Sequence, residues 1–213
     1  MNEIRSRLEG LATKEDVAKL AIRNETYVLG GLPLLKPLPW DALKYSFNRA
    51  EFVHPLIVRE LCGWLSDRGS TVIAVDVAVS NRSNRFFGDY TVADNGGRPR
   101  PTWRGSDGQW FAYSHVATSP SGVQMVECYD SGGGTGIFGR VALLTFEGDL
   151  FLEQTADGKA VPRQRILLKI LGNVWLGDRY IGDIEYRDGR LLIGPDRGAF
   201  ARGAEACDSV SIE

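Results

Sequence analysis

The chain has 213 residues, a formal net charge of −2 at pH 7, and 43% hydrophobic and 24% charged residues. This length suits one domain, or one domain with a small appendage, and buries roughly 70% of the unfolded surface, so stability requires neither disulfides nor a metal. The composition excludes a chain that is disordered throughout, and the near-neutral charge gives no general attraction to nucleic acid or to an acidic membrane.

Residues 1–28 are expected to form an N-terminal helical segment. Ile4, Leu8 and Leu11 lie on one stripe, and the T-K-E-D that follows resembles a capping box. The apolar stripe is narrow, and an isolated helix this short is marginal in water, so the segment needs a partner. Docking on its own domain and self-association through residues 1–23 are the two alternatives.

A connector is expected at residues 29–40, LGGLPLLKPLPW, where three prolines exclude helix. Contact with the domain surface is favoured by Leu32, Leu34, Leu35 and Leu38. Residues 41–213 are interpreted as a single β-rich domain that begins with two helices. The first covers 41–50 and is capped by Asp41. The second covers 55–66, begins with a proline and has apolar residues at helical spacing.

The rest of the chain has the pattern of strands. Apolar and polar residues alternate, and glycine-containing turns separate the segments. The predicted strands are 71–80, 86–92, 109–117, 123–129, 140–147, 149–155, 160–171, 180–187 and 190–194. Asp188-Gly189 between the last two is the preferred pair of a two-residue type I′ hairpin.

Tight turns without intervening helices predict antiparallel pairing. The expected fold class is therefore α+β and mainly β: N-terminal helices followed by an antiparallel β-sandwich or barrel of about eight to ten strands. A half-barrel wrapped around the helix at 55–66 is the alternative.

Three cysteines, Cys62, Cys128 and Cys207, are scattered along the chain. They form no C-x-x-C pair and lack zinc spacing, which predicts reduced thiols in a cytoplasmic protein and no metal site. The N-terminal residues lack the apolar core of a secretory signal, and no apolar run reaches the roughly 20 residues that span a bilayer. We therefore expect no association with a membrane.

One glycine-rich stretch, SGGGTGIFGR, contains the spacing G-x-G-x-x-G of a dinucleotide site. That site needs a helix opening within the glycines, whereas strand-forming residues follow here. We therefore expect no cofactor and interpret the stretch as a loop between two strands. A further alternative is that the loop rims a pocket and that its backbone N–H groups meet an anion. The loop residues in question are Gly132, Gly133, Gly134 and Gly136.

Candidate catalytic residues are Asp76, His115 and Asp130. Asp76 interrupts an apolar strand, where a buried carboxylate must find a partner or raise its pKa. His115 shares a strand face with aromatic residues and can act as a general base. Together they would suit a small hydrolase or lyase with its site in a β-barrel mouth. The simpler alternative is a solvent-facing or paired Asp76 and a packed His115.

The segment 81–115 interleaves arginines with aromatic residues and is the best candidate for a binding surface. Its piece N-G-G-R-P-R-P is expected to be a long irregular excursion. The candidate contacts are Arg85, Arg98, Arg100, Trp103, Arg104 and Trp110. Ordinary strands with solvated arginines and inward aromatics are the alternative.

The lack of a catalytic motif favours a non-catalytic binding or assembly protein over the enzyme described above. Such a protein would present the Arg/aromatic surface to a protein partner or a small ligand. The acidic balance of the chain argues against nucleic acid, because phosphate contacts need a basic footprint.

Overall fold

The fold is that of a computed structural model, which describes residues 44–49, 51–63, 72–77, 86, 88–198 and 208–212. The predicted segments 1–28 and 29–40 lie outside the described residues, as do Arg85 and Cys207.

Within the described residues, the structure has one α-helix, α3, Pro55–Cys62. The ring of His54 caps its start, because Nδ1 accepts a hydrogen bond of 3.1 Å from the Leu56 N–H. Gly63, with φ of 68°, ends the helix four residues before the predicted end at residue 66.

The helix predicted at 41–50 is wrong in its described part. Residues 44–49 form bends, and Ser46 makes a parallel bridge with Phe52. The Ser46 hydroxyl exchanges hydrogen bonds of 3.1 Å with the backbone of Arg49, and Glu51 has φ of 64°. Such local side-chain contacts compete with the helical hydrogen-bond pattern.

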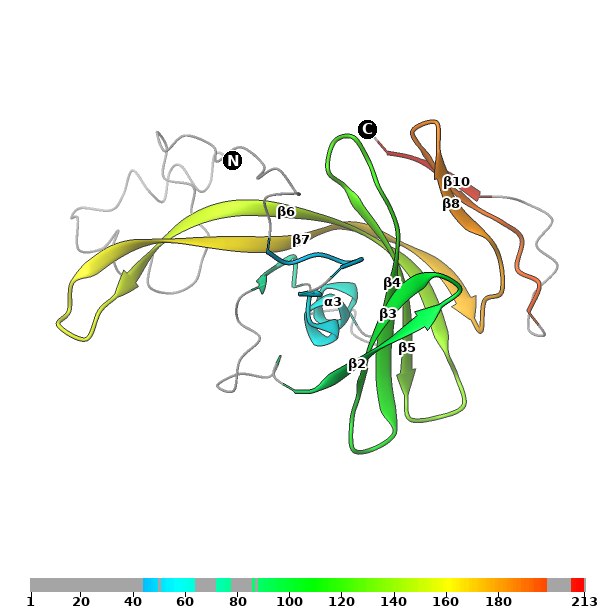
Figure 1. Cartoon of the computed structure of the whole chain (residues 1–213), viewed down its shortest axis with the longest axis horizontal. Helices are drawn as coiled ribbons and strands as arrows, with labels where there is room; N and C mark the ends of the chain where they lie inside the picture. The colour runs from blue at the N-terminus through cyan, green and yellow to red at the C-terminus, as the bar shows by residue number, and fades with distance from the viewer. Residues whose placement is uncertain are drawn as a thin grey trace, which may run out of the picture. The chain divides into compact units, whose positions relative to one another are not determined.

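Seven strands form one open antiparallel sheet in the order β1-β7-β6-β5-β4-β3-β2, and three more form a second sheet in the order β10-β9-β8 (Figure 1). The first sheet contains β1 (Ala74–Asp76), β2 (Tyr90–Asn95), β3 (Arg98–Arg104), β4 (Gln109–Thr118), β5 (Gln124–Gly132), β6 (Phe138–Gln154) and β7 (Ala160–Asp178). The second contains β8 (Ile184–Arg187), β9 (Arg190–Ile193) and β10 (Asp208–Ser211). The mainly β, antiparallel prediction is confirmed.

The hairpin at Asp188-Gly189 is also confirmed, since Arg187 pairs with Arg190 and both turn residues have positive φ, 53° and 74°. Two predicted strands, 140–147 and 149–155, are one continuous strand, β6.

The excursion N-G-G-R-P-R-P is not irregular, because it forms the turn between β2 and β3 and the first half of β3. Pro99 and Pro101 lack an N–H, and β3 pairs with β4 only through the three residues Thr102–Arg104.

The chain divides into two compact units. The described part of the first is residues 148–165, the ends of β6 and β7 with their turn, where the Thr155 hydroxyl donates a hydrogen bond of 2.9 Å to the carbonyl of Lys159. The second unit spans 37–147 and 166–213 and contains α3, the remainder of the large sheet and the small sheet.

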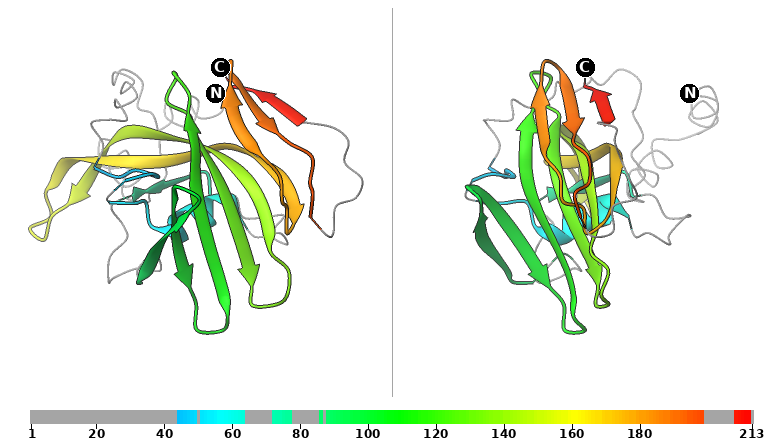
Figure 2. Two further views of the ribbon diagram at one scale, coloured as in Figure 1. Left: turned by 45° about the vertical axis from the view of Figure 1, so that its right-hand side comes forward. Right: turned by 90° about the vertical axis from the view of Figure 1, so that its right-hand side faces the viewer.

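In the second unit, the large sheet has a different cover on each face. On one face, which we call the helix face, Phe111, Tyr113 and Cys128 pack in one core with the buried residues of α3. On the other, the hairpin face, Met125 and Val141 pack in a second core with residues of β8 and β9. Figure 2 shows β8 beside β4, in agreement with their contacts.

The one helix of the described ranges, α3, is not long and apolar enough to cross a membrane.

Candidate binding face and buried charge cluster

The side chains of β3 alternate between the two faces of the large sheet. Trp103 pairs with Phe111 and lies on the helix face, whereas Arg104 pairs with Trp110 on the hairpin face. Arg98 and Arg100 share the face of Arg104, because the three arginines are an even number of positions apart along the strand. The structure thus brings four of the predicted contacts to one face and turns Trp103 to the other.

Arg100 is held in place by its neighbours on this face. Its Nε donates a hydrogen bond of 3.3 Å to the hydroxyl of the buried Ser114. Its guanidinium lies 5.0 Å from the ring centroid of Tyr129 on β5, and the Tyr129 hydroxyl donates a short hydrogen bond to Glu127. Burial raises the pKa of Tyr129, and the charge of Glu127 adds to this effect. These contacts fix the orientation of the Arg100 side chain.

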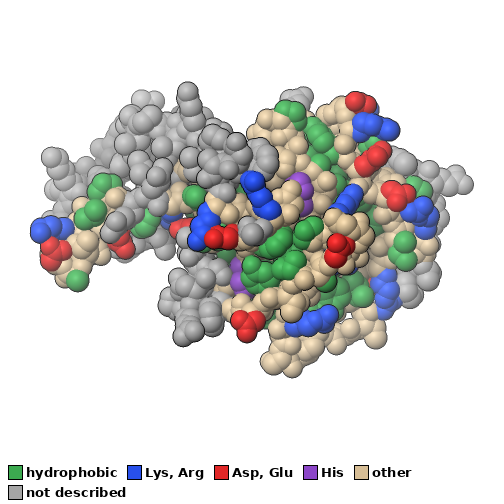
Figure 3. All heavy atoms as spheres, viewed as in Figure 1, with side chains coloured by type: hydrophobic (Ala, Val, Ile, Leu, Met, Phe, Trp, Pro, Cys, Tyr) green, Lys and Arg blue, Asp and Glu red, His purple; other side chains and the backbone are tan. Residues whose placement is uncertain are grey.

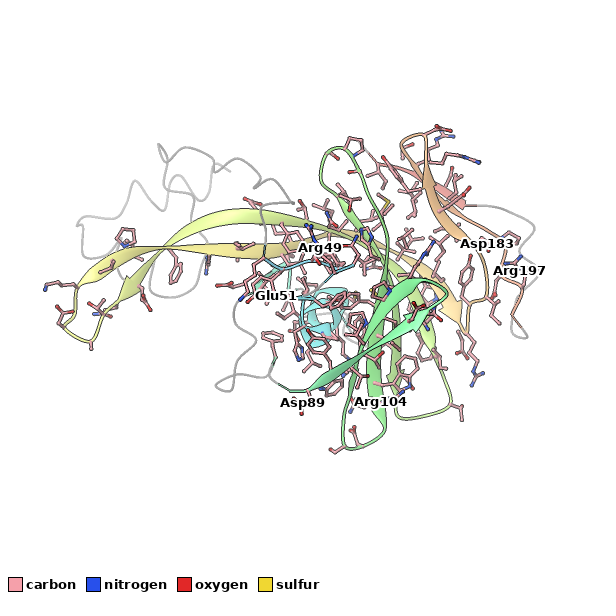
Figure 4. The ribbon with its side chains drawn as sticks, in the orientation of Figure 1. Arg49, Glu51, Asp89, Arg104, Asp183 and Arg197 are labelled. Atoms are coloured by element: carbon pink, nitrogen blue, oxygen red, sulfur yellow. The ribbon has the colours of Figure 1, made fainter. Side chains whose placement is uncertain are left out.

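Arg98 and Arg104, by contrast, are exposed. We name the set Arg98, Arg100, Arg104, Trp110 and Tyr129 the arginine face. Figure 4 marks Arg104 on the ribbon, close to the end of β3.

The arginine face is locally basic. Among the described residues of β2 to β5 that lie on the hairpin face, Glu127 is the single carboxylate against three arginines. Asp94 belongs to the opposite face and accepts a hydrogen bond of 2.7 Å from the Gly97 N–H in its turn. On the side of the molecule drawn in Figure 3, acidic and basic side chains are interspersed, so no single sign of charge dominates that side.

A second group, the buried charge cluster of Arg59, Asp130 and Arg140, lies on the helix face. Arg59 of α3 places Nη2 3.3 Å from Asp130 Oδ1, and its Nε donates a hydrogen bond of 3.4 Å to Oδ2. Its Nη1 donates a bond of 3.0 Å to Gln109, and its guanidinium lies 5.6 Å from the ring of Trp103. Burial raises the pKa of Asp130, which is 2% exposed, and Arg59 opposes that shift.

Arg140 of β6 closes the other side of this cluster. Its Nη1 donates hydrogen bonds of 2.7 Å to the carbonyl of Cys62 and 3.1 Å to that of Gly63, which satisfies the C-terminal end of α3. The Arg140 guanidinium also lies 5.3 Å from the ring centroid of the half-exposed Trp175. Within the described structure, Nε and Nη2 of Arg140 are buried without a hydrogen-bond partner. The cluster thus anchors α3 to β5 and β6.

The glycine loop is held on two sides. Gly133 has φ of 88°, and a Cβ there would lie 2.7 Å from the Asp107 carbonyl oxygen, so the loop packs directly on the turn between β3 and β4. The carbonyl of Thr135 accepts a hydrogen bond from the Arg179 guanidinium. Strand β6 follows the loop, as predicted, and the helix that a dinucleotide site requires is not there.

The candidate catalytic residues do not come together. Asp76 lies on the edge strand β1 and His115 on β4, with β7, β6 and β5 between them. Four inter-strand spacings place the two strands about 19 Å apart across the sheet. His115 is within 2.9 Å of the Thr118 hydroxyl, and burial lowers its pKa. Asp130 pairs instead with Arg59. The described residues also contain no cluster of three His, Cys, Asp or Glu side chains that could hold a metal.

Comparison with known protein families, with characterised proteins and with solved structures gives no match.

Sequence reasoning did not single out Arg59, Arg140, Trp175 or Tyr129. The signal available for Arg140 was a charged residue inside a run of strand-forming apolar residues, which requires a buried partner. Arg59 carried no such signal, because an arginine in a helix is most often solvated.

Proposed function

We propose that the chain is a non-catalytic binding protein that holds an acidic, extended protein segment on the arginine face. The observation that carries this proposal is the projection of Arg98, Arg100 and Arg104 from one face of β3, beside Trp110 and Tyr129. The glycine loop extends this face, because it follows Ser131, which pairs with Trp110.

The chemistry of the face favours carboxylates presented at regular intervals. A guanidinium group binds a carboxylate through two parallel hydrogen bonds. Side chains two positions apart on a strand repeat at about 6.8 Å, which is also the repeat of every second residue in an extended peptide. Glutamates at alternate positions would therefore meet Arg98 and Arg100 in register, and aromatic residues between basic groups favour stacking with the partner.

The test is fluorescence anisotropy with a labelled peptide that alternates glutamate and tyrosine. Each exposed ion pair contributes up to about 1 kcal/mol, so the loss of two pairs in Arg98→Ala combined with Arg104→Ala should weaken binding by up to about thirtyfold. The matched control is Arg187→Ala with Arg190→Ala, which removes the same charge from the exposed hairpin β8–β9. Equal loss in both double variants would mean nonspecific charge attraction, and undetectable binding by the unaltered chain would refute the proposal.

Self-association through residues 1–23 is a separate part of the proposal, supported by their narrow apolar stripe. Light scattering should then give an oligomer for the full chain and a monomer for the chain that begins at Leu29. Identical masses would exclude this role for the segment.

A further inference from the structure

Two cysteines that are far apart in the sequence meet in the core of the second unit. Cys62 ends α3, Cys128 lies in the middle of β5, and their sulfur atoms are 4.0 Å apart. Both are free thiols, with Cys62 8% exposed and Cys128 fully buried. Scattered spacing in the sequence gave no sign of this pairing.

We propose that Cys62 and Cys128 form a redox modification site, in which oxidation joins them in a disulfide that links the end of α3 to β5. The sulfurs must approach from 4.0 Å to about 2.05 Å. We infer that rotation of the two short side chains supplies this approach.

The surrounding backbone favours the bond. Arg140 holds the carbonyl of Cys62 at 2.7 Å, and Arg140 is also the residue opposite Cys128 in the pairing of β5 with β6. The same arginine therefore keeps the helix end beside the strand that carries the second thiol. The disulfide would form within a contact that the folded protein already makes.

The chemistry uses a peroxide as the oxidant. The thiolate of Cys62, the less buried of the two, attacks one oxygen of hydrogen peroxide, which breaks the O–O bond and gives a sulfenic acid and, after protonation, water. Cys128 then attacks that sulfur, loses its proton and displaces a second water. In total, two thiols lose two electrons and two protons to one peroxide. Burial raises the pKa of the Cys128 thiol, so the second step is expected to be slow.

The bond would act on the buried charge cluster. Arg59 belongs to α3, and Asp130 is two residues from Cys128 on β5. A covalent link between these elements would hold the two charges together and constrain the unfolded chain, so the oxidised protein should melt at a higher temperature than the reduced protein.

The experiment uses the full chain with Cys207→Ser, so that the two core cysteines are the remaining thiols. The chain is treated with hydrogen peroxide while folded, and glutathione is treated in a separate tube under the same conditions to show that oxidation has occurred. Mass spectrometry should find a loss of about 2 Da for the two hydrogens removed. A proteolytic digest should contain a peptide pair joined through Cys62 and Cys128, and the melting temperature should rise until dithiothreitol is added.

The controls are Cys62→Ser and Cys128→Ser, each in the same background, which should show neither the linked peptides nor the rise in melting temperature. The proposal is overturned if oxidised glutathione appears while both thiols survive, or if Cys62 becomes sulfinic or sulfonic acid without a link. Linkage that forms only in denaturant would overturn it equally, because the native contact would then play no part.

Discussion

His54 makes the stability of α3 depend on pH. Its Nδ1 accepts the Leu56 N–H at 3.1 Å, and its Nε2 is 3.0 Å from the Gly88 carbonyl, so the neutral ring with its proton on Nε2 satisfies both contacts. A proton on Nδ1 would break the helix cap. Burial lowers the pKa of His54, and the bond to Gly88 opposes this shift. The folded state therefore resists protonation.

The sign of the effect follows from this lowered pKa. Below the ordinary histidine pKa of about 6.5, the unfolded chain binds a proton at His54 that the folded chain does not, so stability falls as the pH falls. The fall ends below the folded pKa, where the ring is charged in both states. Loss of an N-cap costs about 1 kcal/mol, or about 2–4 °C in melting temperature for a chain of this size.

The assay is urea unfolding followed by tryptophan fluorescence at about pH 7.5 and about pH 5, on either side of the histidine pKa. His54→Asn is the informative variant, because asparagine caps helices well and does not titrate. The pKa of His115 is also lowered by burial, but its contribution to the pH dependence of stability is the same in both proteins and cancels in the comparison. On acidification, the free energy of unfolding of the variant should fall by about 1 kcal/mol less than that of the unaltered chain. The same loss in both proteins would refute the role assigned to His54.

Three further predictions concern stability and are measured by the same unfolding assay. Asp130→Asn removes the buried carboxylate that pairs with the partly buried Arg59 and should cost about 1–3 kcal/mol, whereas an unchanged midpoint would mean that the ion pair adds nothing to stability. Gly133→Ala should cost about 1–3 kcal/mol, since its φ is positive and its new Cβ would meet the Asp107 carbonyl at 2.7 Å; an unchanged midpoint would contradict that packing. Tyr113→Phe removes a 2.6 Å hydrogen bond to a buried backbone carbonyl and should cost about 1–3 kcal/mol, and full stability of this variant would show that the carbonyl finds another donor.

The sequence predicted best where the signal was local. Asp188-Gly189 specifies its hairpin through the positive φ that its turn requires. The sequence pattern placed β4 to within one residue at each end, whereas β5 continues to Gly132, three residues past its predicted end. Proline misled the prediction at β3, because Pro99 and Pro101 argue against a strand by propensity. They are tolerated there because β3 pairs with β4 only from Thr102 onward, so β4 needs no N–H from either proline.

The candidate site was predicted only in part, because it depends on pairing between distant strands. Alternation along β3 was enough to place Arg98, Arg100 and Arg104 together once the segment was known to be a strand. The contribution of Tyr129 depends on the register of β4 with β5, which a single sequence does not reveal. The buried charge cluster has the same origin, because α3, β5 and β6 each supply one residue.

The most direct test of the arginine face is a reversal of charge. A variant with Arg98→Glu and Arg104→Glu should lose the glutamate-tyrosine peptide and gain a peptide of the same pattern with lysine in place of glutamate, measured by anisotropy in parallel with the unaltered chain. This exchange of preference is what the face predicts, because the same strand geometry then presents carboxylates to ammonium groups. If the variant still binds the acidic peptide as tightly as the unaltered chain, the arginine face is not the binding surface.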